Sequence, residues 1–209
     1  TDLSQAKYRE LSSRAKKNGS SDSLYKFEGY IVYQLKDASV AASDIKSKDG
    51  SVNTDKARVV FQCDKKNGVK SIINYSTDPD ISAEQYIPKL MVTGTDGGIK
   101  HSFQVNQDLF ASGSAKSLVN YRTYYYIAVA YAYNNFRNFD QTKPDSTQLI
   151  QYLESRTDGR EQPIKVIAAI PHPASDSLYV QTYADYGTGI QIKRIEGTGN
   201  SGIAMDLTK

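Results

Sequence analysis

The sequence has no tryptophan, only two histidines and a single cysteine in 209 residues. One cysteine excludes an intramolecular disulfide and a cysteine-based zinc site. Cys63 shares an alternating face with Val59 and Phe61, so we expect a small buried side chain there and not a reactive thiol. His101 and His172 have no catalytic partner nearby in the sequence, and we expect both to be core or loop histidines.

A concentration of charge is also lacking, because the net charge is only +3. Basic residues adjoin one another at few places, such as Lys16-Lys17 and Lys65-Lys66. That pattern is far from a basic face that neutralises several phosphates, so we expect no nucleic-acid partner. No apolar run approaches the ~20 residues that a membrane helix needs. We therefore expect no membrane span.

Motifs that mark catalysis are missing as well. The sequence has neither a Gly-x-Ser-x-Gly nucleophile elbow nor a phosphate-binding glycine loop. The short glycine motifs at 187–189 and 197–199 are spaced as turns between strands. Nothing in the sequence marks two acids as a glycosidase pair. We therefore expect a protein that is not an enzyme.

Tyrosine, in contrast, supplies 16 residues. The run from Tyr121 to Tyr133 is apolar or aromatic on both alternating faces, which predicts a strand covered on both sides. Leu24 to Leu35 alternates in the same way and predicts an internal strand. A turn at Asn67-Gly68 predicts a hairpin between strands Ala57 to Cys63 and Val69 to Tyr75. These patterns indicate an all-β fold.

Other segments predict interruptions of the sheet. After the hairpin come two prolines, and we expect an excursion with a short helix beginning at Ser82. Ile99 to Val105 alternates as a further strand. We expect a helix over Thr147 to Arg156, capped by Asp145 or Ser146.

The composition along the chain predicts three parts. Residues 1–23 are a loose or partly helical lead-in, residues 24–157 form the main β domain, and residues 158–209 are a linker and the start of a small second β unit. The chain starts without an initiator methionine and stops within a strand pattern, so we expect an internal fragment of a longer protein.

Two segments resemble the fibronectin type III domain. Glu28 to Tyr33 resembles its third strand, and Val119 to Val129 resembles the approach to its sixth. The resemblance implies an immunoglobulin-like β-sandwich in which Tyr125 forms the tyrosine corner, a phenol bonded to upstream backbone. Tyr30 and Tyr125 are 95 residues apart, which nearly fills a sandwich of about 100 residues. The fold then requires long insertions with short helices.

A second resemblance covers most of the chain from Phe27 onward. FEGYIVYQL, KARVVFQCDKKNGV, GIKHSF, LVNYRTYYYIAVAYAYNN and KVIAAIPHP are similar to a repeated segment in large Bacteroidetes surface proteins, of the kind exported by the type IX secretion system. The resemblance implies an extracellular or outer cell-surface location and a structural or adhesive role. Partners are then other domains of the same polypeptide or other surface proteins.

Two alternatives remain open for the function. Exposed tyrosines stack on sugars, so a carbohydrate-binding module with glycan ligands is one. An accessory domain of a secreted hydrolase is the other.

The second resemblance also implies O-glycosylation. Proteins of that group carry glycans at Asp-Ser or Asp-Thr followed by a small or aliphatic residue, and Ser23, Ser177 and Ser146 fit this pattern. Ser146 has a rival role as a helix cap.

Loop carboxylates raise the question of calcium. Asp78 and Asp80 flank a proline, and Asp96 precedes two glycines. Calcium takes such oxygen ligands in extracellular β domains, although turn formation explains the same residues. We expect no other cofactor.

Overall fold

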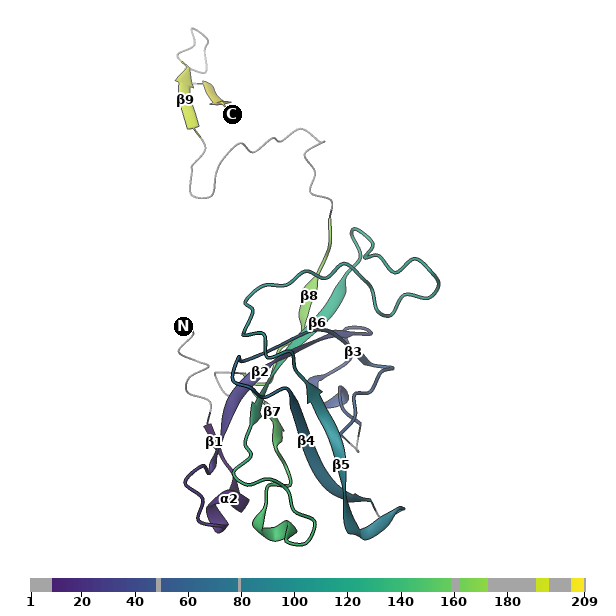
Figure 1. Ribbon diagram of the computed structural model, residues 1–209. Coiled ribbons are helices and arrows are strands. Elements are labelled where there is room, and N and C mark those ends of the chain that lie inside the picture. Colours follow the sequence, from purple (N-terminus) through teal and green to yellow (C-terminus); the bar gives the residue numbers. More distant parts are fainter. Residues whose placement is uncertain are drawn as a thin grey trace. The chain divides into compact units, whose positions relative to one another are not determined.

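The computed structural model describes residues 9–47, 50–78, 80–158 and 162–172, together with two strands at 191–195 and 204–208. The chain divides into two compact units, Thr1–Pro171 and His172–Lys209. Nearly all regular structure is β-strand (Figure 1), which confirms the all-β prediction.

Two long strands form the centre of the first unit. β2 (Leu24–Leu35) pairs antiparallel with β6 (Tyr124–Tyr133) along almost their whole length. β3 (Ala57–Asp64) pairs with the other side of β2, so β2 is internal as predicted. β-branched and aromatic residues fill these strands because their side chains pack well on a pleated surface.

Three short strands complete this six-stranded sheet. β1 (Arg9–Leu11) pairs with the first residues of β2. On the far side of β6, β7 (Tyr152–Glu154) pairs with one end of that strand and β8 (Ile167–Ala169) with the other. β6 is therefore internal too.

A separate hairpin consists of β4 (Ser71–Asp78) and β5 (Ser82–Thr93). The helix predicted at Ser82 is wrong, because the segment continues as a strand. Pro88 lies inside β5, which pairs with β4 alone. Proline is tolerated in such an edge strand, where no neighbour needs its missing amide proton.

The predicted pairing across Asn67-Gly68 is also wrong. β3 pairs with β2 and β4 pairs with β5, so the two strands that flank this turn belong to different sheets. The amides of Asn67 and Gly68 instead donate to the Asp96 carboxylate at 2.7 and 2.9 Å. Anchoring the turn to Asp96 directs the chain into the second sheet.

The strand predicted at 99–105 is absent, because this part of the chain crosses the sheet without regular structure. Phe103 instead stacks on Phe61 of β3, with 4.3 Å between ring centroids. The helix predicted over Thr147 to Arg156 is wrong as well. A 3₁₀ helix, η2 (Pro144–Ser146), precedes it, and the chain then extends into β7 because β6 supplies a pairing edge.

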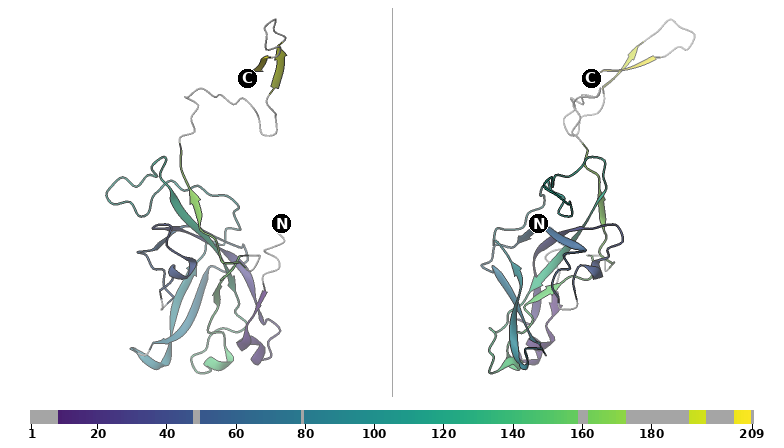
Figure 2. Two further views of the ribbon diagram at one scale, coloured as in Figure 1. Left: turned by 180° about the vertical axis from the view of Figure 1, so that it is seen from behind. Right: turned by 90° about the vertical axis from the view of Figure 1, so that its right-hand side faces the viewer.

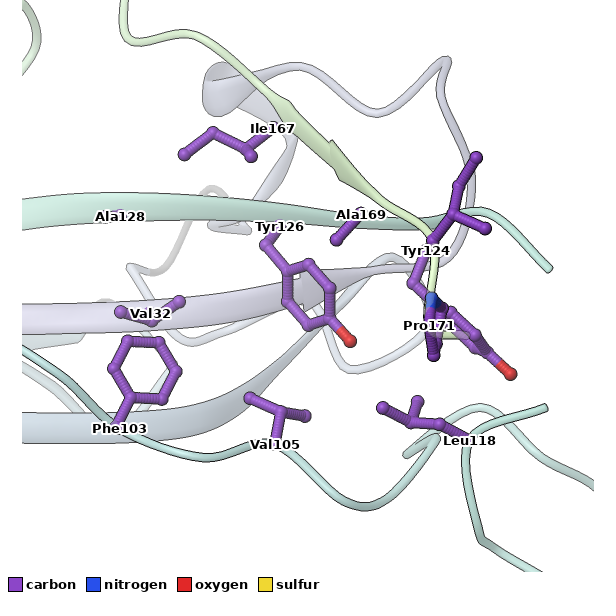
Figure 3. Close-up of a pocket in the computed structure, with 11 residues that line it drawn as sticks. Val32, Phe103, Val105, Leu118, Tyr124, Tyr126, Ala128, Ile167, Ala169 and Pro171 are labelled. Carbon is purple, nitrogen blue, oxygen red and sulfur yellow. The ribbon is translucent and has the colours of Figure 1, made fainter. Parts of the chain in front are cut away.

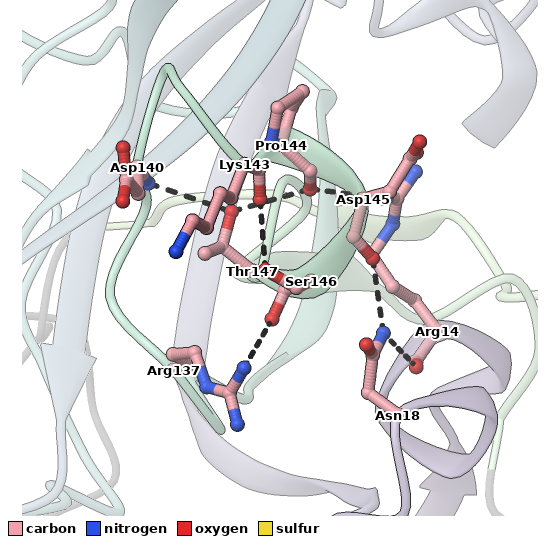
Figure 4. Close-up of polar contacts among 9 residues, drawn as sticks. All are labelled: Arg14, Asn18, Arg137, Asp140, Lys143, Pro144, Asp145, Ser146 and Thr147. Carbon is pink, nitrogen blue, oxygen red and sulfur yellow. Dashed lines mark hydrogen bonds and ion pairs between the residues drawn. The ribbon is translucent and has the colours of Figure 1, made fainter.

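The structure describes the predicted lead-in from Arg9 onward. After β1 comes the short helix α2 (Ser13–Lys17), which Ser12 caps by accepting from the Ala15 amide. Figure 4 shows how α2 contacts η2: Arg14 donates to the Pro144 carbonyl at 3.0 Å. These residues therefore belong to the first unit.

The core lies on one face of the large sheet. Its buried side chains come from β2, β3, β6 and β7, from both strands of the hairpin, and from the segment around the 3₁₀ helix η1 (Ala42–Asp44). They are Ile31, Tyr33, Leu35, Val40, Ile45, Ala57, Ile72, Val92, Ile127, Val129, Tyr131 and Tyr152. Figure 2 shows the hairpin beside the large sheet from two further directions.

In the second unit, β9 (Gln191–Ile195) and β10 (Ala204–Thr208) form an antiparallel pair. The predicted boundary after residue 157 differs from the observed division after Pro171. The difference arises because β8 pairs with β6 and so belongs to the first unit. Within the described residues, no helix has the length and apolar character to cross a membrane.

Candidate functional site

An apolar groove of about 450 Å³ lies on the first unit. Its floor is formed by Tyr124, Tyr126 and Ala128 of β6 together with Val32 of β2. Successive side chains of a strand point to opposite faces. The groove therefore opens on the face of β6 opposite Ile127 and the rest of the core.

The walls of the groove come from two segments far apart in the sequence. β8 and the residues after it supply Ile167, Ala169, Ile170 and Pro171. Residues 97–123, here called the crossing segment, supply Phe103, Val105 and Leu118. Figure 3 shows the ring of Tyr126 between these two walls. Burial raises the pKa of the Tyr126 hydroxyl, and the nearby Tyr124 and Asp108 act in the same direction.

One end of the groove is held by hydrogen bonds around Tyr124. Its hydroxyl accepts from the Val119 amide at 2.8 Å. The Tyr121 amide donates to the Pro171 carbonyl at 2.7 Å, which joins the crossing segment to the residues after β8. The Arg122 guanidinium lies 5.4 Å from the Tyr124 ring centroid. These contacts hold the two walls of the groove together at this end.

Large apolar side chains remain exposed around the groove. Phe103, Val119, Tyr121, Ile167 and Ile170 are between 44% and 75% exposed. A single exposed apolar residue is ordinary. Several on the two segments that frame one apolar groove are typical of a binding surface.

The same two segments are positively charged. Their exposed cations are Lys100, Lys116, Arg122 and Lys165. Residues 97–123 and 162–172 contain one acid, Asp108, whose carboxylate is buried and accepts from the Gln34 amide at 2.7 Å. The Arg122 guanidinium pairs with this carboxylate at 3.5 Å, so the exposed lysines carry the positive charge that these two stretches present to solvent.

A second hollow, of about 430 Å³, adjoins Lys46, Tyr152 and Glu154. The Lys46 ammonium lies 3.9 Å from Glu154 Oε1 and 5.7 Å from the Tyr152 ring centroid. Burial raises the pKa of Glu154, and the Lys46 charge opposes this shift. The Tyr152 hydroxyl and Glu154 Oε1 are shielded from solvent without a well-aligned hydrogen bond to any described residue. We interpret the group as an ion pair at the edge of the core.

The predicted glycosylation residues lie in different surroundings. Ser23 is half-buried just before β2, and its carbonyl accepts from the Ser12 amide at 2.7 Å. Ser146 ends η2 (Figure 4), and its hydroxyl donates to the Lys143 carbonyl at 3.0 Å. It caps no α-helix, since the described residues after it continue into the strand β7. Ser177 lies outside the described residues.

The three candidate calcium ligands do not converge. Asp78 and Asp80 lie at the closed end of the β4–β5 hairpin, where Asp78 accepts from the Asp80 amide. Asp96 follows β5, at the open end of the same hairpin. β4, which separates them, has eight residues, or about 25 Å at ~3.3 Å per residue. In the described part of the chain, no three acidic, histidine or cysteine side chains gather closely enough to hold a metal ion.

The phenol that bonds to upstream backbone is that of Tyr124. Tyr125, the predicted tyrosine corner, points to the other face and packs half-buried against the core. Cys63 is buried and unpaired, as predicted. His101 and His172 are both exposed, the former in the crossing segment.

The groove residues were missed by the sequence reasoning. The apolar character of both faces of β6 did signal that its second face is covered. An irregular segment and the short strand β8 cover it, and the alternation at residues 99–105 does not reveal that this stretch lies against β6 without pairing. We found no protein family, no curated protein and no solved structure that matches this chain.

Proposed function

We propose that this chain is a non-catalytic structural or adhesive module of a secreted, multidomain bacterial surface protein. The observation that carries the proposal is the apolar groove, framed by exposed apolar side chains on β8 and the crossing segment. Surfaces of this kind are used for contacts between proteins. The resemblance to Bacteroidetes surface proteins implies that the chain lies outside the cell and is exported by the type IX secretion system.

The strand arrangement supports a sandwich of the fibronectin type III kind with insertions. In that fold the third and sixth strands belong to the same sheet. β2 and β6, which carry the resemblance to those strands, are paired. The β4–β5 hairpin contributes Ile72 and Val92 to the same core and supplies a second layer. The stretch between β5 and β6, which contains the crossing segment, is then the long insertion.

Adhesion of the purified chain tests the proposal. Beads coated with the chain should bind to cells that produce the parent protein. Ile167→Asp and Ile170→Asp, which place a charge at the groove, should reduce this binding. Ile81→Asp is the matched control, because Ile81 is also exposed but lies between β4 and β5. No adhesion, or equal adhesion of all variants, would contradict the proposal.

Native protein from the same cells gives an independent test of location. We expect a surface-labelled polypeptide with glycan on Ser23 or Ser177. Ser146 should carry less glycan, because its hydroxyl is already bonded to the Lys143 carbonyl. An unlabelled, unmodified protein would contradict the surface assignment.

Carbohydrate binding is a second candidate, favoured by Tyr121. This side chain is 75% exposed beside the groove, and an exposed aromatic ring suits stacking on a sugar. A glycan array separates the two functions. Binding that Tyr121→Ala abolishes would favour the carbohydrate-binding module.

A further inference from the structure

β8 leaves one edge of the large sheet unpaired. It pairs with Tyr124–Tyr126 of β6, and none of the described strands pairs with its other side. Such an edge presents backbone amides and carbonyls in a row, ready to bond to another strand.

The neighbouring edge at β7 is different. The Tyr152 amide donates to the Asn74 side chain at 2.9 Å, and the Asn74 amide group donates to the Tyr152 carbonyl at 3.4 Å. The Tyr75 amide also donates to the Leu149 carbonyl at 2.7 Å. The chain itself thus covers the β7 edge.

The unpaired edge adjoins the apolar groove. Ile167 and Ala169 are alternate residues of β8 and both line the groove. A strand added beside β8 would follow the same pleat, so its alternate side chains would lie over the groove next to Ile167. Backbone pairing and apolar contact are therefore available to one extended segment.

The charge of the surroundings selects the kind of segment. Lys116 of the crossing segment and Lys165, just before β8, are exposed, whereas Asp108 is buried and pairs with Arg122 at 3.5 Å. An incoming strand that carries carboxylates between its apolar residues is attracted, and a basic strand is repelled.

We propose that β8 binds an extended acidic segment of a partner protein as an additional strand, with the segment's alternate apolar side chains in the groove. The inference rests on the proposed adhesive function and names the partner class for the same groove. Strand addition of this kind obtains affinity from main-chain hydrogen bonds and selectivity from alternate side chains.

The test uses the full chain and short synthetic peptides that alternate valine with glutamate. Titration calorimetry should show binding that weakens with added salt, and the peptide with lysine in place of glutamate should bind at least about tenfold more weakly. Lys116→Glu with Lys165→Glu should reverse this preference. Equal binding of both peptides to the unchanged chain would overturn the inference.

Backbone pairing is tested by methylating the peptide's amide nitrogens. In a strand, the amides of successive residues point to opposite edges, so the amides of alternate residues share one edge. Methylation of one alternate set should weaken binding by about tenfold or more, while methylation of the other set leaves it unchanged. Equal effects of the two sets would overturn strand addition.

Two further measurements identify the occupant. Ile167→Asp should abolish peptide binding, and Ile81→Asp should retain it, with both variants showing the unfolding transition of the unchanged chain. If sedimentation shows that the chain dimerises and that Ile167→Asp prevents it, a second copy is the occupant and the inference fails. Adhesion of beads without peptide binding overturns strand addition alone, whereas loss of adhesion overturns the proposed function.

Discussion

Gly29 of β2 leaves the space that the Tyr131 hydroxyl occupies. A β-carbon at residue 29 would lie 2.6 Å from that oxygen and would also collide with the Cys63 carbonyl of β3. The pairing of β2 with β6 shifts register between Phe27 and Gly29. The glycine therefore allows three neighbouring strands to approach closely at an irregular point of the sheet.

Gly29→Ala is expected to lower the free energy of unfolding by about 1–3 kcal/mol, the usual cost of overpacking a core. Denaturant titration measures the change. Gly97→Ala is the control. A β-carbon at residue 97 would have the Thr95 hydroxyl oxygen as its nearest neighbour, at 3.1 Å, and would approach no backbone atom of another strand. Equal stability of the Gly29 variant and the unchanged chain would show that the strands can move apart.

Glu154 should make stability depend on pH. Burial raises its pKa above the ordinary value of 4.5, so the folded chain binds a proton more readily than the unfolded chain. Stability then increases as pH falls from neutral through the raised pKa, and it stops increasing below the ordinary value.

Glu154→Gln should remove this part of the pH dependence. Urea unfolding at several pH values measures it, and the difference between the unchanged chain and Glu154→Gln isolates it from other acids. Asp55→Asn, at an exposed acid, serves as the control. A difference of the opposite sign would mean that the Lys46 ion pair outweighs burial.

Tyr33→Phe should leave stability unchanged or raise it by up to about 1 kcal/mol, because an unsatisfied buried hydroxyl is costly. The Tyr33 hydroxyl is buried and has no hydrogen-bond partner among the described residues. Tyr124→Phe, in contrast, removes the acceptor of the Val119 amide and should lower stability by about 1 kcal/mol. Thermal unfolding distinguishes the two variants, and a clear loss in Tyr33→Phe would contradict this reasoning.

Asp64 connects the end of β3 to the turn after β5. Its carboxylate accepts from the Asp96 amide at 2.8 Å and from the Thr95 amide at 3.3 Å. Asp64→Asn replaces one acceptor oxygen by a donor and should cost about 1.5–3 kcal/mol, as expected for hydrogen bonds to a buried charged group. Asp80→Asn, in the exposed turn, should have little effect. Equal denaturant midpoints for the two variants would contradict the assignment.

The sequence predicted a strand correctly where the apolar alternation of the strand agrees with its pairing to strands on both sides. β2 has the predicted bounds, and β6 lies inside the predicted run. The helix predicted over Thr147 to Arg156 is wrong because the local pattern and the tertiary pairing disagree there. Its apolar spacing fits a helix locally, but pairing with β6 and the bonds of Asn74 to Tyr152 satisfy the backbone as a strand. Neither partner is near in sequence.

The candidate site shows the same division. The sequence by itself determined that the chain forms β-strands, that β6 is covered on both faces and that Cys63 is buried, because side-chain alternation is a local property. Only the tertiary structure decided that β8 lies beside β6, that Phe103 and Leu118 face it across a groove and that no described strand pairs with the outer edge of β8. Those features depend on contacts between residues far apart in the chain, which no local pattern records.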